Sequence, residues 1–406
     1  MKIVHTADWH IGQQFYGYER TKEHSIFFEW LISVVQDYSA DALIIAGDIF
    51  DGPNPSAQSQ RLYYSFLRDI TLRNPSLQVV IIAGNHDSAS RLEAPNALLQ
   101  HMNIFVKGVV SRDLNGNIDL DSMFVPLKRG ESIVAWCVAV PYLRQGDYYS
   151  DGIASLYSAL YDRLYQIKEK NTPIIFTGHL QATGSEISND DRFERSIIGG
   201  LESISPEIFL KPDVVYTALG HLHRAQRVSH NDNIRYSGSP LPFSFAEKNY
   251  KQGVNIVELD IDSPINSQNY VKIDRVEFDA PVKLISIPDS PRPLAEVLEL
   301  ISQLPKGEVC ELSPFLELKI LLNQPEPSMR HQLEEALKDR AVRLASAQPF
   351  KNISQSQEKS IISTYQQLKS ISPVDMAKDI FSKNYGLEMP PELLVLLKEV
   401  IEEVES

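Results

Sequence analysis

Residues 1–12 read MKIVHTADWHIG, and this stretch indicates the fold class of the chain. A short β-prone run, residues 2–6, is followed at once by a polar turn that carries Asp8 and His10. In extended backbone, residues two apart point to one side, so we expect the two side chains to lie together. An Asp-x-His triplet is common by chance, and its meaning depends on whether similar turns recur along the chain.

Similar β-prone runs recur through the first 260 residues and alternate with helical patterns. Near-continuous apolar strands that alternate with helices predict sheets covered on both faces, which is an α/β sandwich. The predicted strands are 2–6, 42–46, 79–83, 133–140, 174–177, 214–219, 234–236 and 254–259, and the clearest predicted helices are 21–38, 56–72 and 155–170.

Five of the predicted strands end in a polar or glycine-containing turn. The turns read TADWH (6–10), AGDIFDG (46–52), AGNHD (83–87), TGHL (177–180) and LGHLH (219–223). Ligands of α/β folds collect at the carboxyl ends of strands, so this repetition predicts a single site. Its candidate residues are Asp8, His10, Asp48, Asn85, His86, His179, His221 and His223.

The residue types in these turns favour a centre of two metal ions. Asp48 follows a strand that reads as buried, where an unpaired carboxylate is costly unless it bridges two cations. His221 and His223 repeat the spacing of the first turn, and Asn85 offers a neutral oxygen. Mixed nitrogen and oxygen ligands without thiolate suit Mn²⁺ better than Fe, Mg²⁺ or Zn²⁺. Two such ions, about 3.5–4 Å apart, activate a bridging water and hold the attacking and leaving oxygens at phosphorus.

His86 has a different expected role. If its neighbour Asn85 reaches the metals, the imidazole of His86 is free to face a substrate. It would then give a proton to the leaving oxygen or stabilise charge on the phosphoryl group. We expect Asp87 to orient the His86 ring from behind.

Composition limits the class of protein. The 406 residues suggest two or three domains, and the net charge of −14 argues against nonspecific nucleic-acid binding unless a partner supplies a basic surface. Cys137 and Cys310 provide neither a disulfide framework nor a CxxC zinc site, which suits a reducing compartment. No signal-peptide pattern and no apolar run near about 18 residues is found, so we expect a cytoplasmic protein without a membrane span.

A second unit is predicted at residues 280–347. It reads strand 282–287, helix 293–304, strand 316–322, helix 328–339 and strand 342–345. Residues 348–406 begin polar and end in two helical patterns within 373–404. In the second pattern Leu393, Leu396 and Leu397 share one face, which is either packed in a core or offered to a partner.

The five turns, in this order, resemble the motifs of the calcineurin-like metallophosphoesterases. The stretches HTADWHIGQQFYG, AGDIFDGPNP, IIAGNHDS, ALGHLHRAQ and RYSGSPLPFSF further resemble the branch of double-strand-break nucleases that work with an SMC-like ATPase. This resemblance implies a four-layer α/β/β/α nuclease domain at 1–279, a small α/β capping domain at 280–347 that contacts DNA, and C-terminal helices in 348–406 that bind the ATPase.

The resemblance also implies residue roles and an activity. One metal would be held by Asp8, His10, Asp48 and His223 and the other by Asp48, Asn85, His179 and His221, with His86 as the catalytic histidine. The implied activity is that of a double-strand exonuclease and single-strand or hairpin endonuclease in DNA repair, recombination and replication. A dimer of nuclease subunits is implied as well.

Two alternatives stay open. One is another phosphoesterase of this fold, although the Asp-Arg-Gly and GNHE of protein phosphatases are replaced here by DIFDG and GNHD. The other is a non-catalytic scaffold, which the full set of ligand residues disfavours. Basic residues near the turns are candidate DNA contacts; they are Arg20, Lys22, Arg91, Arg192, Arg195, Arg224 and Arg235.

Overall fold

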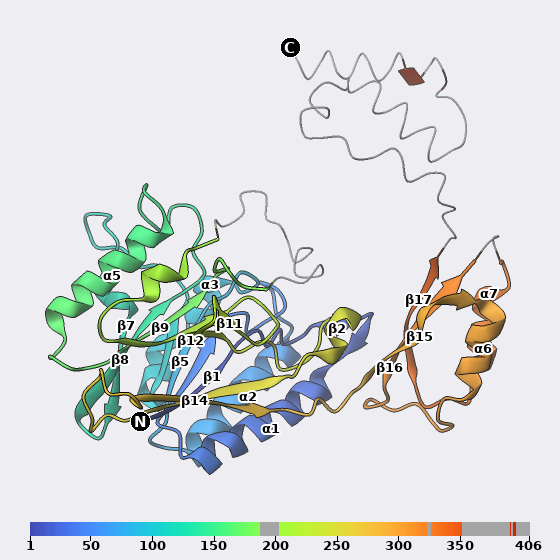
Figure 1. Cartoon of the computed structure of the whole chain (residues 1–406), viewed down its shortest axis with the longest axis horizontal. Helices are drawn as coiled ribbons and strands as arrows, with labels where there is room; N and C mark the ends of the chain where they lie inside the picture. Colours follow the sequence, from blue (N-terminus) through green and yellow to red (C-terminus); the bar gives the residue numbers. More distant parts are fainter. Residues whose placement is uncertain (187–202, 323–325, 351–389, 391–392, 395–406) are drawn as a thin grey trace. The chain divides into compact units, whose positions relative to one another are not determined.

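The computed structural model describes residues 1–186, 203–322, 326–350, 390 and 393–394 (Figure 1). Within these residues, no helix has both the length and the apolar character needed to cross a bilayer. The chain divides into two compact units, residues 1–320 with 326–349 and residues 321–325 with 350–406. The predicted tail helices, within 373–404, lie outside the described residues except for Pro390, Leu393 and Leu394.

Two six-stranded sheets form the larger part of the first unit. In the first sheet the parallel strands β1, β4, β5 and β6 are extended by two antiparallel strands beside β1, in the order β14-β13-β1-β4-β5-β6. Their bounds are β1 Lys2–Thr6, β4 Ala42–Ala46, β5 Gln78–Ile82, β6 Ile104–Lys107, β13 Gly253–Leu259 and β14 Val271–Glu277.

The second sheet has the order β11-β12-β10-β9-β8-β7, with β8, β9, β10 and β12 parallel and the two edge strands antiparallel. Its strands are β7 Phe124–Arg129, β8 Ser132–Val140, β9 Ile174–His179, β10 Val214–Gly220, β11 Gln226–Val228 and β12 Asn231–Tyr236. Both sheets therefore contain parallel strands whose carboxyl ends carry the predicted turns.

Three apolar clusters separate four layers. Ile44, Val80 and Tyr216 belong to the cluster between the two sheets, which is buried on both sides. Helices α1 (Thr21–Tyr38) and α2 (Ala57–Arg73) contribute Phe28 and other side chains to a cluster with the outer face of the first sheet. Helix α5 (Ile153–Ile167) does the same for the second sheet. The α/β/β/α sandwich is thus confirmed.

The remaining described elements are short. They are the strands β2 (Gln14–Phe15) and β3 (Tyr18–Glu19), the helices α3 (Ala89–Glu93) and α4 (Asn96–Leu99), and the 3₁₀ helices η1 (Gln100–Met102), η2 (Leu120–Met123), η3 (Pro206–Phe209) and η4 (Phe245–Asn249).

The element order predicted for residues 280–347 is also found. A three-stranded sheet, β15-β16-β17, is formed by Leu284–Pro293, Phe315–Leu321 and Arg343–Phe350, with the helices α6 (Leu294–Ser302) and α7 (Met329–Leu337) between the strands. Phe315 of β16 packs on Phe15, with ring centroids 4.5 Å apart. Val282 and Phe245 join them in one small apolar cluster.

The two large sheets approach each other closely where β10 ends. An added Cβ at Gly220 would overlap the backbone carbonyl oxygen of Ala46, the last residue of β4. A side chain at this position would force the carboxyl ends of β4 and β10 apart. Glycine is required here because of space, since no unusual backbone angle is involved.

Replacing Gly220 with alanine should lower the free energy of unfolding by about 1–3 kcal/mol, because the added methyl group overpacks this contact. Equilibrium urea unfolding followed by circular dichroism measures the loss. Gly52→Ala is the control, since a Cβ there meets no atom within 4 Å, and its stability should stay within about 0.5 kcal/mol of wild type. Equal stabilities of the two variants would contradict the close approach of the sheets.

Candidate metal centre

The five predicted turns meet at one place. Three follow β1, β4 and β5 of the first sheet, and two follow β9 and β10 of the second. Backbone hydrogen bonds join the first two turns, since the N–H of Asp8 donates to the carbonyl of Gly47 and that of His10 to the carbonyl of Asp48, both at 3.0 Å. Across the sheets, the N–H of His221 donates to Asp8 Oδ1 at 2.9 Å.

The backbone of these turns is not extended. Asp8, His10 and Asp48 have φ angles of 55°, 46° and 50°, and His221 has a φ of 101°. The expectation that an extended chain aligns Asp8 with His10 is therefore wrong, although the two side chains do converge. Left-handed backbone at non-glycine residues costs about 1–3 kcal/mol each and persists only where its surroundings enforce it.

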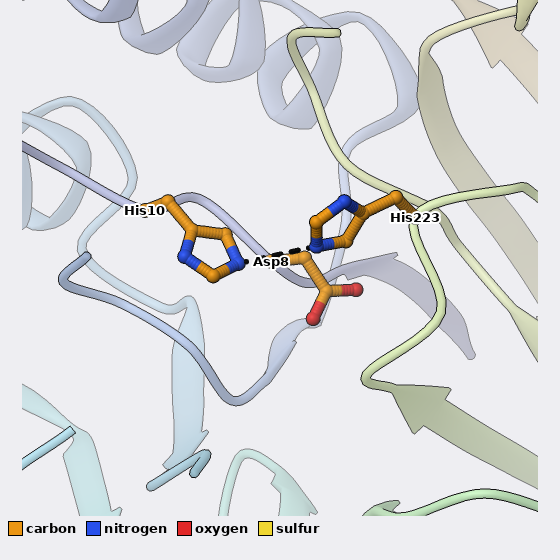
Figure 2. A group of neighbouring side chains, drawn as sticks. All are labelled: Asp8, His10 and His223. Atoms are coloured by element: carbon orange, nitrogen blue, oxygen red, sulfur yellow. Dashed lines mark hydrogen bonds between the residues drawn. The ribbon is translucent and has the colours of Figure 1, made fainter. Parts of the chain in front are cut away.

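One set of ligand atoms comes from the first and last turns. Asp8, His10 and His223 each offer an atom within 4.8 Å of the other two (Figure 2). Nε2 of His10 lies 3.2 Å from Nε2 of His223, so both imidazoles face the same point. The Asp48 carboxylate reaches this set too, with Oδ2 at 3.6 Å from His10 Nε2.

A second set lies on the other side of Asp48. Oδ1 of Asn85 is 2.9 Å from Nε2 of His179 and 3.1 Å from Nδ1 of His221. Nε2 of His179 is also 3.3 Å from Oδ2 of Asp48. The same Asp48 oxygen thus faces both sets, which is the position a bridging carboxylate would take.

The donor atoms fit divalent cations. Asp8 and Asp48 are both buried, and burial raises the pKa of the Asp8 carboxyl to about 6. Burial acts in the same direction on Asp48, but the imidazoles of His179 and His10 lower its pKa overall. Oδ2 of Asp8 is buried without a hydrogen-bond donor, which is costly for a carboxylate unless a cation lies beside it. Two carboxylates with imidazole and amide ligands suit a divalent metal centre.

The ring orientation of His179 is fixed by the backbone. Its Nδ1 lies 2.8 Å from the carbonyl oxygen of Ala46, which only accepts, so Nδ1 is the protonated nitrogen. The lone pair of Nε2 is then directed at Asp48 and Asn85. Ordering of this kind is typical of histidines that bind metals.

His86 is held at the edge of both sets. Its backbone N–H donates to Oδ1 of Asp48 at 2.9 Å, and its ring Nδ1 lies 2.9 Å from the carbonyl oxygen of Asp51. Nε2 of His86 is buried and has no hydrogen-bond partner. The ring also offers an atom within 4.8 Å of those of His10 and Asp48, so His86 borders the first ligand set.

The prediction for Asp87 is wrong. Its carboxylate accepts the backbone N–H groups of Ile49, Phe50 and Gly84, at 3.1, 3.0 and 2.9 Å, and so joins the second turn to the third. The carbonyl of Asp51 orients the ring of His86 instead. Neighbours in sequence point in different directions here, and sequence alone gives no sign of that.

Several of the candidate DNA contacts have other partners. Arg20 is buried and makes two hydrogen bonds to Glu23, at 2.9 and 2.7 Å, so it is not available to DNA. Arg224 pairs with Glu186, and Arg91 donates to Asn54 at 2.9 Å. Arg192 and Arg195 lie outside the described residues.

Two residues beside the centre were not predicted. The ring of Phe243 lies 4.8 Å from that of His10 and 4.9 Å from that of His223. Oε1 of Glu247 lies 3.1 Å from Nδ1 of His223, and both side chains are buried. Glu247 follows His223 by 24 residues, and no spacing rule connects the two positions.

Comparison with known proteins agrees with this geometry. The profile of the calcineurin-like phosphoesterases matches residues 1–225, and that of the type 5 capsule protein repressor C-terminal domain (SbcD_C) matches residues 280–385. The SbcD subunit of nuclease SbcCD from Rhodobacter capsulatus is 35% identical over 367 residues, which cover 85% of this chain and 86% of that protein.

The SbcD subunit from Escherichia coli K12 is 32% identical over 63% of this chain and 64% of its own length. That from Bacillus subtilis is 34% identical over 64% of this chain and 66% of its own length. The matched profile covers more than half of the chain, and the Rhodobacter protein aligns with most of it. The chain therefore belongs to the calcineurin-like phosphoesterases and, within them, to the SbcD family of nuclease subunits.

Proposed function

We propose that this protein is a metal-dependent DNA nuclease that hydrolyses phosphodiester bonds as a subunit of an SbcCD-type complex. The observation that carries the proposal is the position of Asp48, whose Oδ2 lies 3.6 Å from His10 Nε2 and 3.3 Å from His179 Nε2. Two ligand sets that share one carboxylate are the arrangement of two-metal phosphoesterases. The names of the relatives supply the substrate and the complex.

In this proposal, Asp8, His10, Asp48 and His223 hold one ion, and Asp48, Asn85, His179 and His221 hold the other. Mn²⁺ is the preferred metal, because the set mixes imidazole with carboxylate and amide oxygens and contains no thiolate. When bound, such a pair of ions supplies an activated water and neutralises charge on the scissile phosphate.

His86 is the proposed catalytic histidine. Because the carbonyl of Asp51 accepts a hydrogen bond from Nδ1, a neutral His86 has an unprotonated Nε2. Only the imidazolium form carries a proton on Nε2, the nitrogen that faces the ligand sets. In that form His86 can donate a hydrogen bond to a phosphate oxygen and deliver the proton to the leaving oxygen.

The rest of the chain is proposed to serve DNA and the partner. Residues 280–347 would be a capping domain that contacts DNA, and residues 348–406 would bind an SMC-like ATPase of the SbcC type through their helices. The match of the SbcD_C profile to residues 280–385 supports this division. A dimer of nuclease subunits, double-strand exonuclease and hairpin endonuclease activities, roles in repair, recombination and replication, and a cytoplasmic location complete the proposal.

The alternatives are a phosphodiesterase for free nucleotides and an inactive scaffold of the same fold. Linear, hairpin and circular DNA incubated with Mn²⁺, with and without the ATPase and ATP, distinguishes them from the nuclease. Cleavage of DNA is expected, and 2′,3′-cyclic AMP serves as the small competing substrate. Hydrolysis of the cyclic nucleotide with DNA left intact would support the phosphodiesterase, and no hydrolysis of either would support the scaffold.

His86→Ala should retain both Mn²⁺ ions and DNA binding while cleavage falls by about 10²–10⁴-fold, because a general acid is lost and no proposed ligand is removed. Calorimetric titration with Mn²⁺ and a gel assay of linear DNA measure the two properties. His101→Ala, at an exposed position, is the control. Loss of a bound ion in the His86 variant would show that His86 is a ligand.

Asp48→Ala should bind neither ion tightly, because the one oxygen that both ligand sets share is removed. Calorimetric titration with Mn²⁺ gives the stoichiometry, and circular dichroism checks that the variant is folded. Asp37→Ala, a change on the surface of helix α1, provides the matched control. Two ions bound with wild-type affinity would rule out a bridging role for Asp48.

Deletion of residues 373–406 should abolish binding to the ATPase subunit, because the proposed partner-binding helices are removed. Mn²⁺-dependent hydrolysis of bis-p-nitrophenyl phosphate should persist, since all proposed ligands lie before residue 224. Size-exclusion chromatography with the purified ATPase measures complex formation. Loss of both properties would instead indicate that the tail packs in the core.

A further inference from the structure

A buried carboxylate lies behind one of the proposed metal ligands. Glu247, in the 3₁₀ helix η4, places Oε1 at 3.1 Å from Nδ1 of His223. The side chains are 4% and 1% exposed, so the contact is almost free of solvent. On the opposite side of the same imidazole, Nε2 lies 3.2 Å from Nε2 of His10 and faces the ligand set (Figure 2).

The contact determines which nitrogen of His223 carries the proton. An ionised carboxylate only accepts hydrogen bonds, so Nδ1 of His223 must be the donor. In the neutral ring Nε2 is then unprotonated, and its lone pair is directed at the metal position. A carboxylate behind a metal-binding histidine fixes the tautomer and the ring orientation and makes the imidazole a stronger donor.

The second oxygen of Glu247 is also used. Oε2 accepts the backbone N–H of Phe243 at 2.8 Å. The Phe243 ring packs edge-on against His10 and His223, with centroids 4.8 and 4.9 Å away. Arg20 holds the preceding residue, since its Nη1 donates to the carbonyl of Pro242 at 2.6 Å. One carboxylate thus fixes a ligand imidazole and the loop that flanks it.

We propose that Glu247 is a positioning residue of this metal centre. Its carboxylate holds His223 in the tautomer protonated at Nδ1 and aims Nε2 at the ion bound with Asp8 and His10. This inference rests on the proposed function, because it takes His223 to be a metal ligand. Glu247 itself does not contact the metal or the substrate.

The first test is calorimetric titration of the full-length protein with Mn²⁺. Glu247→Ala should weaken one of two ions by about 10–100-fold and leave the other unchanged, because the second ligand set does not include His223. Glu247→Gln keeps an acceptor oxygen and should lose less affinity than the alanine variant. Glu317→Ala is the matched control, a buried glutamate of β16 that accepts from Ser286 at 2.8 Å, and it should bind both ions as wild type does.

The outcomes separate this inference from the proposed function. A wild-type protein that binds no Mn²⁺ would overturn the metal centre itself. Two ions bound by wild type and bound equally well by Glu247→Ala would overturn the role of Glu247 alone. Equal weakening of both ions would likewise contradict it, since a general loss of structure would affect both sets.

The second test needs no change at Glu247. Imidazole ¹⁵N spectra of the metal-free wild-type protein, at a pH where the ring is neutral, report the tautomer of each histidine. The His223 signals, assigned by their absence from His223→Asn, should show protonation at Nδ1. Protonation at Nε2 would overturn the inference, and this result stands even if the alanine variant does not fold.

Discussion

The carboxylate of Asp48 is buried at the junction of the two sheets, and this placement constrains the structure around it. Removing a carboxylate from water costs on the order of several kcal/mol unless its oxygens are satisfied. Oδ1 is satisfied by the N–H of His86, at 2.9 Å, while Oδ2 faces imidazoles from two different sheets. The bonds that satisfy this one group therefore also join β4 to β5 and the first sheet to the second.

The turns around Asp48 show how the chain tolerates an unfavourable backbone. Asp8, His10 and Asp48 all lie in the left-handed region, yet each belongs to a turn tied by backbone hydrogen bonds. Gly84 contributes in a different way, since any Cβ there would overlap Oδ1 of Asp48. Strain and close approach are thus concentrated at the proposed ligands, where a precise arrangement has chemical value.

Sequence predicted the buried parts of the fold well. Strands 2–6 and 42–46 match β1 and β4 to the residue, because central parallel strands are continuously apolar. Strand β14 was missed, since this edge strand alternates lysine, aspartate and arginine with apolar residues. The ligands were predictable because each follows a strand, whereas the contact of Glu247 with His223 depends on the path of a loop between them. Left-handed backbone at Asp8 and the direction of Asp87 arise from tertiary hydrogen bonds, which local sequence does not encode.

The pairing of β1 with β13 has a consequence for how the protein is made. Ile3 pairs with Val257, so a strand at the start of the chain waits for a partner about 250 residues later. At ordinary rates of translation this interval is roughly 10–50 s. During that time one edge of β1 has no native neighbour, and unpaired strand edges are sites of aggregation. The nascent chain therefore needs protection of this edge, by a chaperone or by transient local structure, until β13 has left the ribosome.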